Sequence, residues 1–301
     1  MSISNFLFGE NIPLLRLEKF SQEYILNVEN TFLMGKENPA ISLKTSSDII
    51  IEQEKRGHDI NTTIKLQEIT GDTEDHVMKP FLLQSIALAD ISRTIQLKRD
   101  TSGKILSVEN KADLWKNWEE WKESKLANTF PEEKDQNKLI TNYEKGLKNF
   151  DVELKKNLQY ILLLPEVYNL IFPPNEYYSF LFSPSAIHSR LIDGVEYNYQ
   201  LKLVKLEEEN NNLFVEFHSV LNNQDELMKD HIKKLYEKEK YFSIDQFEFS
   251  IKIKYNFEKS TAKILNAELH FVEKMHEHLA YRIDMELNSK STEVYNNNKE
   301  L

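Results

Sequence analysis

Three histidines near the carboxyl end form the densest group of side chains that could bind a metal ion. His270, His276 and His278 lie close together in the sequence, with Glu273 and Glu277 between them. Side chains two residues apart on a strand point to the same side, so His276 and His278 could chelate zinc or nickel if a strand ran through both. The pattern differs from the helical His-Glu-x-x-His motif. We favour polar residues at a turn between two strands, and we expect no cofactor.

The three tryptophans of the chain are the second candidate group. Trp115, Trp118 and Trp121 recur at intervals of three residues in a segment with helical periodicity. They could form an aromatic platform for a ligand or a partner protein. Alternatively, they could form the apolar stripe with which a helix covers a sheet. We favour the stripe, because an exposed patch of three tryptophans would lower solubility.

A third candidate is the aromatic segment that contains Tyr177, Tyr178 and Phe180, shortly after Pro173 and Pro174. These side chains could line a cleft that binds a ligand or a partner, or they could fill that cleft. We favour filling.

Familiar catalytic signatures are absent from the sequence. There is no Gly-x-Gly-x-x-Gly fingerprint, no phosphate-binding loop and no Gly-x-Ser-x-Gly elbow. The chain has no cysteine, which excludes disulfides and thiolate chemistry. Its 38 basic and 49 acidic residues give a net charge of -11, which disfavours binding to nucleic acid. An enzyme of unrecognised type, metal-assisted at the histidines, is therefore the alternative hypothesis and not the leading one.

Alternating hydrophobicity predicts antiparallel strands at both ends of the chain. The clearest run is 247–257, in which every odd position is apolar and every even position is polar. Similar or weaker runs are found at 24–34, 41–51, 60–66, 91–97, 105–108, 197–203, 213–217, 265–271 and 279–287. Apolar residues at intervals of three and four predict two or three helices in 111–163, with a break near Pro131, and one helix in 225–240.

An internal repeat is suggested by two short matching segments. Residues 101–110 and 260–269 share Lys-Ile-Leu and a following Glu at the same spacing. Each segment is preceded by two strands, a helical or ambiguous stretch and a further strand, so the order of elements matches as well. In this architecture the chain resembles uncharacterised duplicated β-rich bacterial proteins and, distantly, the half-open barrels of bacterial lipoprotein carriers. The resemblance implies binding at the concave face of a curved sheet, and it transfers no catalytic residue.

The predicted fold is α+β, with two antiparallel β-rich lobes and a helical insert between them. We expect an N-terminal segment at 1–20, lobes at 21–110 and 176–289, a helical connector at 111–175 and a flexible tail at 290–301. The apolar N-terminal segment either packs on its own domain, which we favour, or docks a partner. No signal peptide and no membrane-spanning run is recognisable, which predicts a soluble cytoplasmic protein unless a leader has been removed.

The leading functional hypothesis is a non-enzymatic binding or assembly protein. Its curved sheet or the cleft between its lobes would hold a protein, a peptide or an apolar ligand. A third hypothesis is a structural subunit of a larger bacterial assembly, docked through the N-terminal segment.

Overall fold

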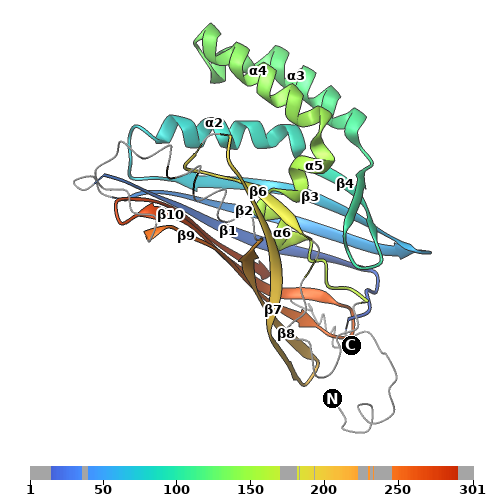
Figure 1. The fold of residues 1–301 in the computed structure, drawn as a ribbon. Coiled ribbons are helices and arrows are strands. Elements are labelled where there is room, and N and C mark those ends of the chain that lie inside the picture. Colours follow the sequence, from blue (N-terminus) through green and yellow to red (C-terminus); the bar gives the residue numbers. More distant parts are fainter. Residues whose placement is uncertain are drawn as a thin grey trace, which may run out of the picture.

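The structure, a computed structural model, describes residues 15–35, 40–169, 182, 184–192, 194–222, 230, 233 and 246–290. Eleven strands of this part of the chain form one antiparallel sheet, in the order β5-β4-β3-β2-β1-β11-β10-β9-β8-β7-β6 (Figure 1). The strands of the first half are β1 (Phe20–Met34), β2 (Ile41–Arg56), β3 (Asp59–Asp72), β4 (Thr94–Asp100) and β5 (Ile105–Val108). Those of the second half are β6 (Ser185–His188), β7 (Glu196–Glu209), β8 (Asn212–Leu221), β9 (Glu248–Glu258), β10 (Lys263–His276) and β11 (Leu279–Ser289).

The single sheet shows that the prediction of an α+β fold with two lobes was wrong. β1 pairs with β11 along its length, from Tyr24 opposite Ser289 to Met34 opposite Leu279. Strands from the beginning and the end of the chain are thereby joined in one continuous ladder. Alternation along a strand shows which face is buried, but it carries no information about which strand lies alongside. Backbone groups on both sides of β1 need partners, and β2 and β11 supply them.

The strand periodicity itself was read correctly. In β9 the inward-facing side chains of Ile251, Ile253, Tyr255 and Phe257 are all buried. The intervening lysines of the same strand are exposed on the outer face. The apolar inner face continues across β10 and β11 and forms one contiguous core.

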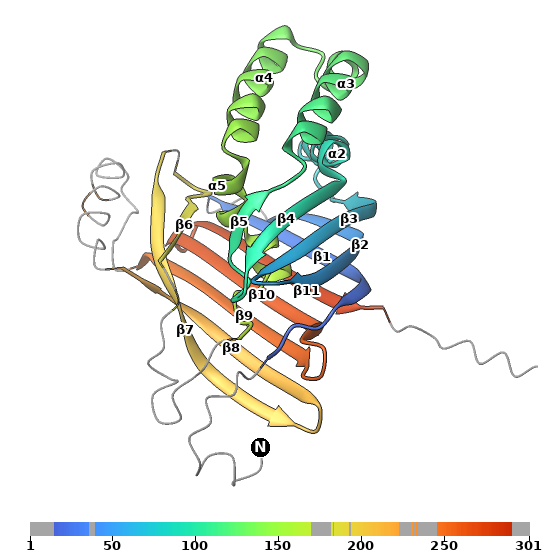
Figure 2. The same cartoon turned by 90° about the vertical axis from the view of Figure 1, so that its right-hand side faces the viewer.

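The helices with defined bounds lie between residues 79 and 163. They are α2 (Lys79–Ala89), the short 3-10 turn η1 (Asp90–Ser92), α3 (Lys111–Thr129), α4 (Glu133–Lys148), α5 (Phe150–Lys155) and α6 (Leu158–Leu163). α2 lies over the sheet, and α3 and α4 extend beyond it as a helical hairpin (Figures 1 and 2). The predicted break near Pro131 is confirmed, and the segment 111–163 contains four helices where two or three were expected. Of the predicted helix 225–240, only Asp230 and Lys233 are described, and both are helical.

The described elements do not test the proposed repeat, and in the first half three strands, not two, precede the helix. β1, β2, β3, α2, β4 and β5 follow one another in the first half, and β6, β7, β8, β9 and β10 follow in the second. The two matching segments contain the turn and second-strand residues of the β4–β5 and β9–β10 hairpins. β11 has no counterpart in the first half and lies between β1 and β10. Duplication of an ancestral unit stays a prediction.

Helix α5 connects the two edge strands of the sheet (Figure 2). Asp151 accepts a hydrogen bond from the backbone N–H of Val108, in edge strand β5, at 2.7 Å. At the other end of α5, Lys156 forms an ion pair with Glu196, at the start of β7. β7 pairs in turn with the second edge strand, β6. The sheet therefore curves so that its edge strand β5 and β7, which is next to the other edge, both contact the segment 151–156.

The described end of the N-terminal segment packs on the body of the protein. Leu15 and Leu17 are buried. The backbone N–H of Asn169 donates to the carbonyl oxygen of Leu15 at 2.9 Å. These contacts support packing on its own domain, the interpretation favoured from sequence, for residues 15–19; residues 1–14 lie outside the described part.

Candidate functional site

A cavity of about 260 Å³ lies between the inner face of the sheet and the segment that contains α5 and α6. Both edge strands contribute to its wall, β5 through Ile105 and β6 through Ala186. The rest of the apolar lining comes from β7, β8, β9, the helices and the segments next to them: Val152, Leu154, Tyr160, Ile161, Leu164, Pro165, Val167, Phe182, Pro184, Tyr199, Leu201, Phe217, Ile253 and Tyr255. Such a concave, mainly apolar site with few polar groups is typical of small-ligand pockets.

The strand residues of the lining are positioned by the period of two. Tyr199 and Leu201 are alternate residues of β7, and Ile253 and Tyr255 are alternate residues of β9. Alternate residues on a strand project from the same face, so each pair points inward. Phe217 on β8 lies between the two strands and stacks edge-on against Tyr255, with ring centroids 6.3 Å apart. This part of the wall is therefore built from aromatic and aliphatic side chains of β7, β8 and β9.

Helix α6 divides the space enclosed by the sheet. The hydroxyl of Tyr255 donates to the carbonyl oxygen of Ile161 at 2.9 Å and fixes the helix against β9. A second cavity of about 120 Å³ lies on the other side, against β2, β3 and β4, and Tyr160 lines both. Leu162 and Leu163 are buried against the sheet. The helix fills the middle of the concave face and leaves the larger cavity next to the sheet edges.

Two polar groups in the cavity wall lack internal partners. Glu166 and Tyr199 both line the cavity, and neither side chain forms a hydrogen bond or an ion pair with another described residue. Burial raises the pKa of the Glu166 carboxyl, which nearby Lys104 partly opposes. Burial also raises the pKa of the Tyr199 hydroxyl, and the charge of Glu166 adds to that effect. Neither group is among the buried polar atoms without a partner, so water or a ligand in the cavity can reach and satisfy both.

Three lysines lie at the same cavity. Lys104 and Lys155 have exposed side chains and form no ion pair among the described residues, whereas Lys156 is paired with Glu196. Both Lys104 and Lys155 act on the carboxyl of Glu166 and lower its pKa. The cavity thus combines an apolar interior with free positive charge near Glu166.

A buried arginine supports the cavity from behind. The side chain of Arg99 is fully buried, and its guanidinium donates to Gln53 Oε1 at 2.7 Å, to the Gly103 carbonyl at 2.6 Å and to the Pro165 carbonyl at 2.8 Å. It also lies over the ring of Tyr168, 5.5 Å from the centroid. Burial lowers the pKa of Arg99, but a guanidinium remains charged in proteins. Arg99 therefore fixes both the β4–β5 hairpin and the residue before Glu166.

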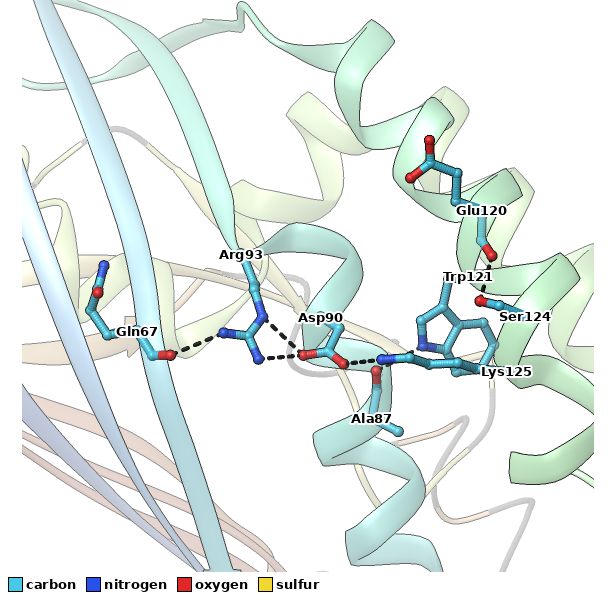
Figure 3. Close-up of polar contacts among 8 residues, drawn as sticks. All are labelled: Gln67, Ala87, Asp90, Arg93, Glu120, Trp121, Ser124 and Lys125. Carbon is cyan, nitrogen blue, oxygen red and sulfur yellow. Dashed lines mark hydrogen bonds and ion pairs between the residues drawn. The ribbon is translucent and has the colours of Figure 1, made fainter.

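The tryptophans lie away from this cavity, in the helical layer. Trp118 and Trp121 are buried, and their rings stack with centroids 5.9 Å apart. Trp121 Nε1 donates to the carbonyl oxygen of Ala87 in α2 at 2.9 Å (Figure 3). Trp118 stacks on Tyr143 of α4, at 4.5 Å between centroids, and Trp115 is partly buried against the same core. These contacts support the apolar stripe; a role in ligand or partner binding stays a prediction without a contact to favour it.

Ion pairs complete the junction between α2 and α3. Asp90 accepts from Arg93 and from Lys125, at 2.6 Å in each case (Figure 3). The two cations lower the pKa of Asp90 against the opposing effect of its partial burial. This cluster joins η1 to α3 and positions the helical hairpin.

The three histidines do not converge. His270 and His276 lie on the outer face of β10, six residues apart, which is about 20 Å along a strand. His270 Nδ1 is 2.6 Å from Asp284. His276 and His278 do approach each other, with ring centroids 5.9 Å apart, but His276 Nδ1 accepts the backbone N–H of His278 at 3.0 Å. In the described ranges, no three His, Cys, Asp or Glu side chains form a group suited to a metal ion.

The two glutamates near the histidines have separate environments. Glu277 lies 3.0 Å from His278 Nε2 at the turn. Glu273 instead points into the core, where its carboxylate accepts hydrogen bonds from Ser189, from the Arg190 N–H at 2.6 Å and from the Tyr197 hydroxyl at 2.9 Å. This buried carboxylate fixes the end of β6 against β10.

Tyr177, Tyr178 and Phe180 lie outside the described residues. Phe182, two residues beyond them, lines the cavity and meets Phe217 edge-on at 5.0 Å.

Sequence reasoning did not select Glu166 or Arg99. The sequence around each of them nevertheless shows a charged residue at a position where apolar residues are expected. Glu166 is the one acidic residue of the otherwise apolar run 160–168, and Arg99 continues the inward positions of Ile95 and Leu97. A charge in a buried register indicates a buried polar network, although its partners cannot be identified from the pattern.

Comparisons with known proteins show weak likenesses. No family model matches the chain, and no curated protein matches it. Among solved structures, DynF from the dynemicin biosynthesis pathway of Micromonospora chersina aligns with 93% of this chain and 84% of its own, at 6% identity and a TM-score of 0.22. A putative outer membrane lipoprotein-sorting protein domain from Vibrio parahaemolyticus aligns with 90% of this chain and 84% of its own, at 8% identity and a TM-score of 0.15. At these scores the likenesses carry no argument about function.

Within the described part of the chain, none of the helices has the length and apolarity needed to span a bilayer.

Proposed function

We propose that this chain is a binding protein that holds a small apolar ligand in the cavity between its sheet edges and α5–α6. The observation that carries the proposal is the construction of the cavity wall. Aromatic and aliphatic side chains from β7, β8, β9 and the helices line it, and the wall contains two polar groups, Glu166 and Tyr199, without partners among the described residues.

The energetics agree with a preformed site. Burial of apolar ligand surface contributes roughly 25 cal/mol per Å², and a rigid wall loses little side-chain entropy on binding. Tyr255 is fixed by its hydrogen bond to Ile161, and Phe217 by its edge contacts with Tyr255 and Phe182. The lining therefore requires little rearrangement to accept an apolar molecule.

The test uses the neutral apolar fluorophore 1-aminoanthracene and a substitution that fills the cavity. Ala186 of β6 lines the cavity, so Ala186→Phe should occupy part of its volume and weaken binding at least tenfold. Ala127→Phe makes the same chemical change on the exposed surface of α3 and should bind like the parent protein.

Fluorescence titration measures the affinities, and circular dichroism with thermal unfolding checks that both variants fold. Absence of saturable binding to the parent protein, or equal affinity in a folded Ala186→Phe variant, would overturn the proposal.

A further inference from the structure

We infer that the ligand of this cavity is an anionic amphiphile, such as a fatty acid, whose head group is bound by Lys104 and Lys155. This inference rests on the proposed function and assigns the chemical class of the ligand.

The charge at the cavity is positive, in contrast to that of the whole chain. The chain as a whole carries a net charge of -11, yet three lysines and one glutamate line this cavity. Lys156 is neutralised by Glu196, while Lys104 and Lys155 have no ion-pair partner among the described residues. A local excess of positive charge on an acidic protein attracts anions to that place.

Lys104 lies on a backbone segment that several hydrogen bonds hold in place. Lys104 follows Gly103 in the β4–β5 hairpin. The carbonyl oxygen of Gly103 accepts a hydrogen bond from Arg99 Nε at 2.6 Å. The Lys104 backbone N–H donates to Asp100 Oδ1 at 2.9 Å, and the Asp100 N–H donates to the Lys104 carbonyl at 2.9 Å. The backbone that carries this ammonium group is therefore fixed, although the side chain itself is free to meet a head group.

Arg99 contributes a further positive charge from behind the wall. Its guanidinium donates to neutral oxygens of Gln53, Gly103 and Pro165, so no described carboxylate pairs with it directly. The charge of Glu166 acts on it from a distance. A cationic ligand would be repelled by Lys104 and Lys155 at the cavity and by Arg99 behind its wall, which disfavours amines.

Glu166 opposes an anion, and this effect can be measured separately. Burial raises the pKa of its carboxyl, so the group takes up a proton more readily than an exposed glutamate does. Removing its charge should strengthen the binding of an anionic ligand and leave a neutral ligand unaffected. The two lysines should have the opposite effect on the same anion.

The experiment compares dodecanoate with 1-dodecanol, which has the same chain length and a neutral head. Displacement of 1-aminoanthracene from the full chain gives both affinities at pH 8. We expect dodecanoate to bind at least tenfold more tightly. The double variant Lys104→Gln, Lys155→Gln should weaken the binding of dodecanoate about tenfold, since it removes the charged hydrogen-bond donors to the carboxylate, and such bonds are among the stronger ones. Glu166→Gln should raise the affinity for dodecanoate, because it removes a negative charge from the cavity wall. Neither variant should change the affinity for dodecanol more than twofold.

The control is Lys145→Gln, Lys252→Gln, which removes two exposed lysines that do not line the cavity. It makes the same change in net charge and should leave dodecanoate binding unaltered. Equal affinities for acid and alcohol, or equal losses in the two double variants, would refute the anionic head group while the binding function stands. Failure of both amphiphiles and of the fluorophore to bind would refute the binding function itself.

Discussion

Arg99 donates a hydrogen bond from Nη2 to the carbonyl oxygen of Pro165 at 2.8 Å. This contact joins β4, near one edge of the sheet, to the segment that follows α6 and lines the cavity. The same guanidinium bonds the Gly103 carbonyl and Gln53. One buried side chain therefore couples the first half of the sheet, its terminal hairpin and the wall of the candidate site.

Replacing Arg99 by methionine should lower the free energy of unfolding by about 3–5 kcal/mol, as breaking a buried charged network does. The loss arises because Gln53 Oε1 and the Gly103 and Pro165 carbonyls would lose their charged donor. Urea unfolding followed by circular dichroism measures the change.

Arg56→Met is the control for Arg99→Met. Arg56 is exposed and paired with Glu54 on the outer face, so its replacement should change stability by less than about 0.5 kcal/mol. Equal effects of the two substitutions would contradict the role assigned to Arg99.

Gly103 should tolerate no side chain. Its φ is +100°, and a Cβ there would come within 2.5 Å of the Pro165 carbonyl oxygen and 2.8 Å of Arg99 Nη2. We expect Gly103→Ala to destabilise the fold by about 3 kcal/mol, from backbone strain and displacement of that carbonyl. Gly57→Ala is matched to it, because Gly57 also has positive φ (+63°) but a Cβ at that position would meet no other atom within 4 Å. Gly57→Ala should lower the free energy of unfolding by only about 1 kcal/mol. Thermal unfolding of both variants checks the difference, and similar melting temperatures would show that the close approach does not matter.

The charge of Glu166 should make stability depend on pH. Its pKa in the folded protein is raised above the ordinary value of 4.5, mainly by burial. The folded state thus holds this proton more tightly than the unfolded state. Stability from this group is therefore full below pH 4.5 and is lost as pH rises through the folded-state pKa. We expect Glu166→Gln to be more stable than the parent protein at pH 8 and to lose this advantage near pH 4.

Glu29→Gln provides a comparison of opposite sign. A hydrogen bond from Ser42 lowers the pKa of Glu29, so its charged form is favoured by the fold. Removing that charge should give no gain at pH 8. Urea unfolding at pH 4, 6 and 8 measures both variants; a gain for Glu29→Gln equal to that for Glu166→Gln would point to a general effect of net charge instead.

Trp121 should act through its hydrogen bond as well as its burial. Trp121→Phe keeps an aromatic ring but removes the donor to the Ala87 carbonyl, and we expect a loss of about 1–2 kcal/mol. Trp115 is only partly buried and its side chain has no hydrogen bond among the described residues, so Trp115→Phe should cost less than half as much. Chemical denaturation gives both values. An equal or larger loss at Trp115 would contradict the junction between α2 and α3 described above.

Much of the local structure was accessible from the sequence because it depends on short-range patterns. Alternation in 247–257 is set by the period of a strand, and it correctly placed Ile251, Ile253 and Tyr255 on the inner face. The spacing of Trp118 and Trp121 correctly indicated one buried side of a helix. The turn at Asp100–Gly103 was predicted from residues that favour turns, and β4 and β5 do form that hairpin.

The tertiary structure decided which strands became neighbours and which buried groups met. The pairing of β1 with β11 joins residues more than two hundred positions apart, and no local pattern encodes it, so one sheet formed where two lobes were expected. For the same reason Arg99, Gln53 and Pro165 could not be connected from the sequence, and Glu166 could not be placed at a cavity. Burial and periodicity are properties of a segment, whereas this cavity is a property of the whole curved sheet, because its wall takes residues from both edge strands.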